Sequence, residues 1–256
     1  MLLAIDIGNS NIVWGVYEGE ALRGHWRVAT DTNKTSDEYG LLFLGLLEMA
    51  GIRGDRVSGA ILSNVVPSLT STFEQMVGSY FHQLPYIVSA DSDTGLAIRY
   101  SNPAEIGGDR LVNAVAAYAR YQTALIIIDF GTATTFCAIT HIGEYLGGAI
   151  APGLSIAADA LFSRTAKLPK VDLTRPKAVI GTDTSSSIQS GLIFGYAGLV
   201  DELVGRLQAE LGHTSKIIAT GGLATLIAPE SRTIEEVRPL LTLEGLELIY
   251  RRTRGG

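Results

Sequence analysis

The sequence predicts an α/β fold built from two similar lobes, each with a sheet covered by helices. Three features of the 256 residues predict it: short continuous apolar runs, helical segments between them, and an internal repeat. Continuous apolar runs of this length are typical of strands that are buried on both faces, and such strands need helices on both sides of their sheet. Because 46% of the residues are hydrophobic, the chain can bury a sizeable core.

Four buried strands are predicted by apolar runs that end in glycine or polar residues. These runs cover residues 2–7, 60–66, 125–130 and 216–219. The first predicted helix begins after Thr35, because Thr35–Glu38 reads T-x-x-E, the pattern of a capping box. Its expected buried face carries Leu41, Leu44 and Leu47. Further helices are predicted over residues 109–121, over 187–211, which is followed by Gly212, and over 242–252.

A strand followed by Asp-x-Gly and a small polar cluster occurs twice in the chain. Residues 6–17 read DIGNSNIVWGVY and residues 129–139 read DFGTATTFCAI, so the two aspartates lie 123 positions apart. A repeat of about half the chain indicates a duplicated lobe and not a solenoid. We therefore expect one lobe over residues 1–115 and a second over 116–256, with no visible linker between them.

Composition excludes several classes of function. The net charge of −6 argues against nucleic acid as the main partner, because binding to nucleic acid needs a basic surface. Cys137 is the only cysteine, so neither a disulfide within the chain nor a Cys-based metal site can form; its apolar and β-forming neighbours predict a buried thiol. The histidines are scattered and are expected to be surface or structural residues: His25, His82, His141 and His213. No apolar run approaches a membrane span and the N-terminus does not resemble a signal peptide, so we expect a cytoplasmic protein with no membrane partner.

The first Asp-x-Gly turn has the composition of a phosphate-binding turn. Asp6 ends a predicted strand, Gly8 permits a tight turn, and residues 9–11 add polar groups without bulk. Backbone amides in such a turn can bind phosphate oxygens, and a carboxylate at the strand end can hold Mg²⁺ through water. One copy alone is also compatible with an ordinary β-hairpin. The second copy, which contains Asp129, Gly131, Thr132 and Thr134, favours a pair of turns that binds ATP between two lobes.

The segment Gly107-Gly108-Asp109-Arg110 precedes a predicted helix. The two glycines permit a close approach of backbone or substrate, and the planar guanidinium of Arg110 suits a carboxylate. Asp109 is compatible either with a catalytic base or with a helix N-cap. If it lies at the helix start, the helix dipole is expected to keep it ionised and therefore weakly basic.

Five segments in this order resemble type III pantothenate kinases, which belong to the actin, Hsp70 and sugar kinase superfamily. The resemblance covers nearly the whole chain and rests on residues 6–15, 100–110, 129–135, 147–153 and 184–191. It implies two actin-like, ribonuclease H-like lobes from a duplicated unit, with ATP in the cleft between them. It also implies ATP-dependent phosphorylation of pantothenate to 4′-phosphopantothenate, the first step of coenzyme A biosynthesis.

The resemblance assigns roles to residues at matching positions. It makes Asp109 the catalytic base, and Asp129 the ligand of a monovalent cation, K⁺ or NH₄⁺. Asp6 is expected to hold Mg²⁺ through water. The implied ATP-binding residues are Asp6, Ile7, Gly8, Asn9, Ser10, Asn11, Ile12, Val13 and Thr132. The implied pantothenate-binding residues are Tyr100, Gly107, Gly108, Asp109, Arg110 and Thr184.

Several of these positions keep a structural alternative. Tyr100 is also compatible with a half-buried strand aromatic, and Thr184 with a loop or cap hydroxyl. Gly221 and Gly222 follow the last predicted strand and either approach a nucleotide or make a tight turn. One side of a predicted helix carries Gly191, Gly195 and Gly198. These glycines indicate close helix packing, within the chain or across the homodimer that the family implies.

Two other functions remain compatible with the sequence. One is another kinase or a phosphatase of the same superfamily, such as a sugar kinase; the short chain, Tyr100 and the Gly107–Arg110 motif argue against it. The other is a nucleotide-binding regulator or actin-like scaffold without catalytic activity. Such a scaffold needs no acceptor pocket, so the presence of Asp109 and Arg110 argues against it.

Overall fold

The computed structural model describes residues 1–254, which fall into two compact units. The first unit comprises Met1–Leu96, Ser101–Ala116 and the segment that begins at Leu241. The second comprises Ala97–Tyr100 and Ala117–Leu240. This division differs from two contiguous lobes because the last helix packs on the first sheet, whereas residues 97–98 pair with a strand of the second. The expected boundary near residue 115 falls inside a helix, which explains why no linker is visible in the sequence.

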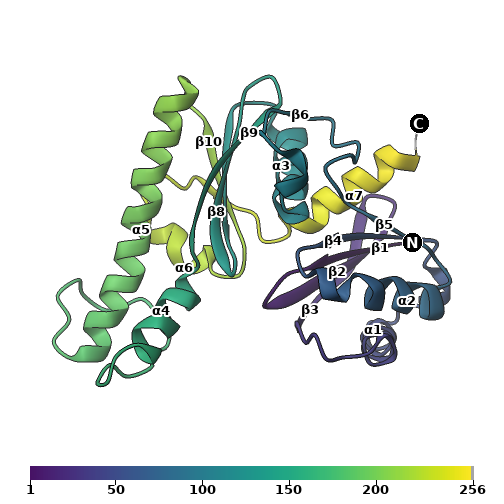
Figure 1. Ribbon diagram of the computed structural model, residues 1–256, viewed down its shortest axis with the longest axis horizontal. Helices are drawn as coiled ribbons and strands as arrows, with labels where there is room; N and C mark the ends of the chain where they lie inside the picture. The colour runs from purple at the N-terminus through teal and green to yellow at the C-terminus, as the bar shows by residue number, and fades with distance from the viewer. Residues whose placement is uncertain (255–256) are drawn as a thin grey trace. The chain divides into compact units, whose positions relative to one another are not determined.

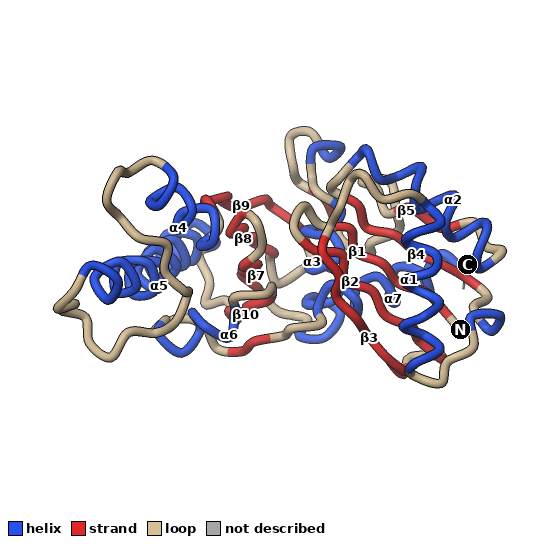
Figure 2. Tube along the Cα trace, turned by 90° about the horizontal axis from the view of Figure 1, so that it is seen from below, coloured by secondary structure: helices blue, strands red, loops and turns tan. Residues whose placement is uncertain are grey.

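The first unit contains a five-stranded mixed sheet in the order β3-β2-β1-β4-β5 (Figure 2). Strands β1, β2 and β3 are antiparallel neighbours, and β4 and β5 continue the sheet parallel to β1. The strands are β1 (Leu2–Ile7), β2 (Asn11–Glu18), β3 (Ala21–Ala29), β4 (Gly59–Asn64) and β5 (Pro85–Ile87). Strand β1 is buried along nearly its whole length, as its continuous apolar run predicts.

Helices α1 (Ser36–Met49) and α2 (Thr70–Phe81) pack on one face of this sheet. The predicted capping box is present, because Thr35 and Glu38 cap one another at the start of α1. The prediction for Leu41 is wrong: it is 66% exposed, and the buried stripe contains Tyr39, Phe43 and Leu47. The largest buried side chains of this core are aromatic, and the ring of Trp14 stacks on Phe43 with centroids 4.0 Å apart. The short 3₁₀ turns are η1 (Gly54–Arg56), η2 (Pro67–Leu69) and η3 (Pro103–Glu105).

The C-terminal helix α7 (Leu241–Arg254) belongs to the first unit because glycines let it approach closely. A methyl group on Gly59 of β4 would overlap the Tyr250 hydroxyl, and one on Gly245 of α7 would lie 2.1 Å from the carbonyl oxygen of Val112. The Arg252 guanidinium donates a hydrogen bond to the carbonyl of Thr94. The basic end of this helix therefore packs partly on the first unit.

The second unit contains a six-stranded sheet in the order β11-β10-β7-β8-β9-β6 (Figure 1). Its strands are β6 (Ala97–Ile98), β7 (Leu125–Phe130), β8 (Ala133–Ile139), β9 (Glu144–Pro152), β10 (Lys216–Thr220) and β11 (Glu236–Val237). The long helix α5 (Thr184–Leu211), green in Figure 1, packs on one face through its buried aliphatic stripe. Helix α4 (Leu154–Ser163), helix α6 (Ala224–Ile227) and the turn η4 (Ala228–Glu230) complete this unit.

The two sheets repeat one topology, as the internal repeat predicts. The order β3-β2-β1-β4-β5 corresponds to β9-β8-β7-β10-β11, with three antiparallel strands followed by two parallel ones in each case. Strand β6 is an addition to the second sheet and pairs parallel with β9. Within residues 1–254, no helix combines the length and the apolarity that crossing a bilayer requires.

Candidate active site

The first turn connects β1 to β2 and is held by two hydrogen bonds. The amide of Gly8 donates to the carbonyl of Asn11 at 3.1 Å, and the Thr30 hydroxyl donates to the Gly8 carbonyl at 2.6 Å. A methyl group on Gly8 would lie 2.9 Å from the Asn11 carbonyl oxygen, so the turn requires glycine. Asn9, Ser10 and Asn11 are exposed at its tip, as a phosphate-binding turn needs.

Two of the expected ATP-binding residues contribute only backbone at this turn. The side chains of Ile7 and Ile12 are fully buried in the core against α1 and α2, and Val13 is half-buried. Since side chains alternate along a strand, Asp6 faces away from that core. Its register partner on β4 is Ser63, so both side chains lie on the sheet face opposite α1 and α2.

Helix α3 (Gly108–Tyr121) begins on the same face as Asp6. A methyl group on Gly108 would lie 3.1 Å from the hydroxyl oxygen of Ser63, and one on Gly107 would lie 2.5 Å from Oδ1 of Asp109. These two glycines therefore make room for Ser63 and for the Asp109 carboxylate. Because the helix begins at Gly108, Asp109 sits in its first turn and not at its N-cap, so the N-cap interpretation is wrong. Its Oδ1 accepts a hydrogen bond of 2.7 Å from the amide of Arg110.

The protonation of Asp109 differs from the expectation. Burial raises the pKa of its carboxyl above the ordinary value, against the lowering effects of the Arg110 amide and of the Arg110 charge. The prediction that the helix start would keep Asp109 a weak base is therefore wrong in direction, because desolvation outweighs the helix end. A carboxylate with a raised pKa is a better proton acceptor, which suits general-base catalysis. Arg110 is only 7% exposed, so it is buried close to Asp109.

The second turn, between β7 and β8, resembles the first but is held by different hydrogen bonds. The amide of Gly131 donates to the Ala133 carbonyl at 3.1 Å, and the amide of Gly153 donates to the Thr132 carbonyl at 3.1 Å. Asp129 and Thr132 are half-buried here. Gly221 follows β10 with a φ of +90°, and a methyl group there would lie 2.4 Å from Oδ1 of Asp129. Gly221 therefore closely approaches the turn that contains Asp129.

Tyr100 and Thr184 also belong to the second unit. Tyr100 is half-buried and lies just beyond β6, with its ring centroid 6.4 Å from that of Tyr145. Thr184 is exposed as the first residue of α5. The interpretation of Thr184 as a cap is wrong, because Asp183 and Ser186 form the capping box of that helix. The Thr184 hydroxyl is therefore not needed to start the helix.

Comparison with known proteins places these features in a family. The family model described as type III pantothenate kinase matches residues 2–206. A type III pantothenate kinase of Geobacter sulfurreducens is 54% identical over 254 residues, which is 99% of this chain and 100% of that protein. One of Syntrophotalea carbinolica is 51% identical over 255 residues, with 100% of both chains covered. The chain belongs to the type III pantothenate kinase family.

Solved structures agree on the fold of this type III pantothenate kinase family member. An inorganic polyphosphate/ATP-glucomannokinase of Arthrobacter aligns with a TM-score of 0.52 at 15% identity, covering 98% of each chain. The ethanolamine utilization protein EutJ of Carboxydothermus hydrogenoformans aligns with a TM-score of 0.56 at 15% identity, covering 96% of this chain and 89% of that one. At such identities the likeness concerns the fold alone, which is the two-lobed actin-like fold that the family resemblance implies.

In this kinase family member, one buried polar residue beside Asp6 was not predicted from the sequence. Ser63 is fully buried, and its hydroxyl has no hydrogen-bond partner among the residues that the structure describes. It lies beside Asp6 in the β1–β4 register and beside Gly108. Only its polar side chain within the predicted strand at residues 60–66 offered a signal for it.

The donor set in the described residues suits hydrated cations. Residues 1–254 contain no cluster of three or more His, Cys, Asp or Glu side chains that could enclose a metal ion. Mg²⁺ in kinases is held by one or two carboxylates, by waters and by substrate phosphates, so a single Asp6 carboxylate at a phosphate-binding turn fits it. The carboxylate of Asp129 and nearby backbone carbonyls likewise offer the oxygen ligands that a monovalent cation takes.

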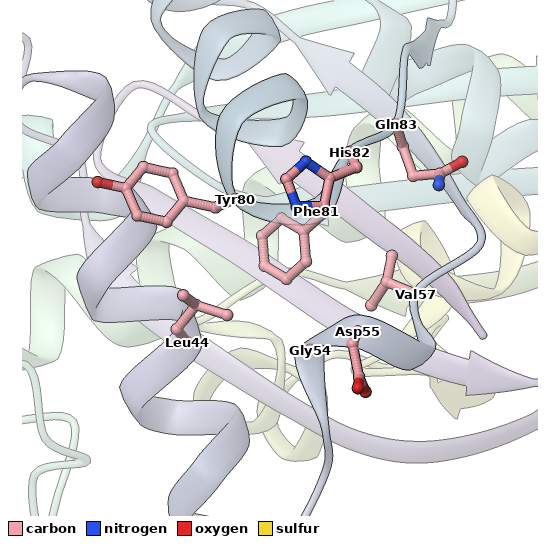
Figure 3. A pocket seen from close by; sticks show the side chains of 8 residues that line it. All are labelled: Leu44, Gly54, Asp55, Val57, Tyr80, Phe81, His82 and Gln83. Carbon is pink, nitrogen blue, oxygen red and sulfur yellow. The ribbon is translucent and has the colours of Figure 1, made fainter.

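A pocket of about 280 Å³ on the first unit lies apart from these residues (Figure 3). Its walls come from α1, from η1 and from the end of α2, and include Leu44, Val57, Phe81 and His82. None of the predicted site residues lines it, so it is not the candidate active site.

The remaining predictions concern single residues. Cys137 is buried as expected, with Sγ 3.3 Å from the Tyr145 hydroxyl. All four histidines are exposed, although the rings of His141 and His213 meet with centroids 5.3 Å apart, which their separation in sequence does not predict.

Proposed function

We propose that this protein transfers the γ-phosphoryl group of ATP to pantothenate, giving 4′-phosphopantothenate and ADP, the first step of coenzyme A biosynthesis. The observation that carries the proposal is the family match over nearly the full chain, at 51–54% identity to type III pantothenate kinases. The buried Asp109 at the start of α3 supports it, because this is a carboxylate with the properties of a base.

Asp109 is the proposed catalytic base. Its carboxylate accepts the proton of the primary hydroxyl of pantothenate while the hydroxyl oxygen bonds to the γ-phosphorus and the bond to the β-phosphate bridging oxygen breaks. ADP leaves with the electron pair of that bond. Phosphoryl transfer depends mainly on positioning and on charge stabilisation, so the base supplies only part of the rate enhancement.

The residues proposed to bind pantothenate are those that the family resemblance implies. The small exposed part of Arg110 would pair with its carboxylate, and Gly107 and Gly108 let the substrate approach the backbone. Tyr100 and Thr184 are also proposed to contact the substrate; the freedom of the Thr184 hydroxyl from capping supports its role.

ATP is proposed to bind at the two turns. The exposed tip at residues 9–11 and Thr132 would contact the phosphates, with Ile7, Ile12 and Val13 contributing backbone groups. Mg²⁺, when bound, neutralises phosphate charge, and Asp6 would hold it through water. A monovalent cation, K⁺ or NH₄⁺, is proposed to bind at Asp129, where it would add positive charge near the phosphates.

We further propose a cytoplasmic homodimer. Gly191, Gly195 and Gly198 are exposed along α5, and a methyl group on any of them would meet no atom within 4 Å. Packing within the described chain therefore does not explain these glycines, whereas close approach of a second copy does. Light scattering of the purified protein should give twice the mass of 27.2 kDa, and Gly195→Leu should shift it toward the monomer.

The function is tested by direct detection of the product. Purified protein with ATP, Mg²⁺ and K⁺ is offered pantothenate, a hexose or no acceptor, and the acceptors are analysed by mass spectrometry. Phosphorylated pantothenate with no phosphorylated hexose supports the proposal. Phosphorylation of the hexose alone, or ADP release without an acceptor, would contradict it.

A further inference from the structure

Tyr100 is held in place by a short strand that belongs to the second sheet. Strand β6 is only two residues long, yet the amide of Ala97 donates to the Gly143 carbonyl and the amide of Arg99 donates to the Tyr145 carbonyl, each at 2.9 Å. The Arg99 guanidinium also pairs with the Glu144 carboxylate at 2.8 Å. These contacts fix the register in which Tyr100 leaves the strand.

The ring of Tyr100 fills the place of a missing side chain. Gly147 of β9 has a φ of +112°, and a methyl group on it would lie 2.9 Å from Cε2 and 3.0 Å from Cδ2 of Tyr100. In the β8–β9 pairing Leu146 is an extra residue, because Ala138 faces Gly147 and Ile139 faces Tyr145. Such a bulge locally re-aims the strand, and here it lies immediately before the glycine.

A second aromatic limits the movement of Tyr100 on another side. The Tyr145 ring is fully buried and tilted by 58° to that of Tyr100, and its hydroxyl lies 3.3 Å from the Cys137 sulfur. Tyr145 and the backbone at Gly147 are therefore fixed, whereas Tyr100 is half-buried. Any added bulk at position 147 is relieved most easily by displacement of the Tyr100 ring.

We infer that Gly147 is a positioning residue for pantothenate: the absence of its side chain seats the Tyr100 ring in the orientation that the substrate meets. The inference rests on the proposed contact between Tyr100 and pantothenate. Gly147 touches no substrate and acts through Tyr100 alone. A substitution of Gly147 should therefore change the apparent affinity for pantothenate and leave the KM for ATP unchanged.

The test compares Gly147→Ala, Tyr100→Ala and the double variant with the wild-type enzyme. Gly147→Ala should raise the KM for pantothenate about tenfold, with kcat within about threefold and the KM for ATP unchanged. In the double variant the two effects should not add, since both act through one ring. Gly212→Ala is the matched control, because Gly212 also has a positive φ, of +67°, in the same unit but no atom within 4 Å of the added methyl. It should lose stability without a change in KM.

The outcomes separate the inference from the proposed function. If Tyr100→Ala raises the KM for pantothenate while Gly147→Ala matches Gly212→Ala, the inference is overturned and the function stands. If Tyr100→Ala leaves the KM unchanged, the role of Tyr100 and with it the inference are overturned. Should Gly147→Ala not fold, Arg99→Ala provides the second probe: loss of its ion pair with Glu144 should raise the same KM about threefold, and an unchanged KM overturns the inference.

Discussion

The β1–β2 and β7–β8 turns have the same backbone scaffold and different surroundings. In each, an aspartate is the next-to-last residue of the first strand, and a glycine amide two residues later donates to a backbone carbonyl across the turn at 3.1 Å. Beside Asp6 lie Ser63 and the start of α3, which carries Asp109, the proposed base. Beside Asp129 lies the backbone of Gly221. The duplication therefore preserved the turn, while the neighbouring strands and helices gave each carboxylate its own chemistry.

The largest effect is expected from Asp109→Asn, which removes the proton acceptor beside the first turn. We expect kcat to fall by about 10²- to 10⁴-fold, the usual range for a general base. Thermal unfolding should be unchanged or occur at a slightly higher temperature, because Asn also accepts the hydrogen bond from the Arg110 amide without a buried charge. Steady-state kinetics and a melting curve measure the two effects.

Asp37→Asn is the matched control for this variant. Asp37 is likewise the second residue of its helix, α1, but it is exposed and far from the turn in sequence. It should leave kcat unchanged. A kcat of Asp109→Asn within threefold of the wild-type value would exclude Asp109 as the base.

The pH dependence should follow the raised pKa of Asp109. The base acts when deprotonated, so kcat/KM should fall on acidification through a pKa above the ordinary 3.8, and Asp109→Asn should lose this limb. For stability the sign is opposite: a raised folded-state pKa stabilises the protein below pH 3.8, and that contribution is lost as the pH rises through the folded-state pKa. The stability advantage of Asp109→Asn should therefore exist at neutral pH and vanish in acid. A wild-type acid limb that persists in the variant would contradict the assignment.

The sequence predicted the scaffold better than the site. The strands at 2–7 and 125–130, the capping box at Thr35 and the duplication follow from local patterns, because buried strands and helix starts leave their signature in neighbouring residues. Ser63 and the proximity of Gly221 to Asp129 depend on strand pairing between distant segments, which no local pattern encodes. The raised pKa of Asp109 depends on burial, which also needs the tertiary structure.

Gly221→Ala tests whether the surroundings of the second turn control the proposed cation site at Asp129. The added methyl would meet Oδ1 of Asp129 and the backbone of Phe130, so the carboxylate must move. We expect activation by K⁺ to weaken about tenfold, measured as the K⁺ concentration for half-maximal rate. Gly143→Ala has a similar φ, +81° compared with +90°, and a clash with Tyr118 instead, so its K⁺ activation should stay normal. Equal K⁺ activation in both variants would show that Gly221 has no specific effect on the proposed cation site.

A smaller effect is expected from Ser63→Ala beside the first turn. Because the buried hydroxyl has no partner among the described residues, its removal should not lower the free energy of unfolding by more than about 0.5 kcal/mol. Ser190→Ala is the contrasting variant, since the Ser190 hydroxyl donates to the Val179 carbonyl and its loss should cost about 1 kcal/mol. If Ser63 serves the site, its variant should raise the KM for ATP about threefold at unchanged stability. A loss of stability equal to that of Ser190→Ala would make Ser63 a structural residue.

The proposed division of cations between the two turns is tested most directly by Asp6→Asn and Asp129→Asn, assayed side by side. Rates are measured with K⁺ or with Na⁺ at constant ionic strength, over a range of Mg–ATP concentrations. We predict that Asp129→Asn is slow and equally active in K⁺ and Na⁺, with the KM for Mg–ATP little changed. Asp6→Asn should keep its preference for K⁺ and need at least about tenfold more Mg–ATP. Wild-type activation by K⁺ in Asp129→Asn, or the same loss of K⁺ preference in both variants, would contradict it.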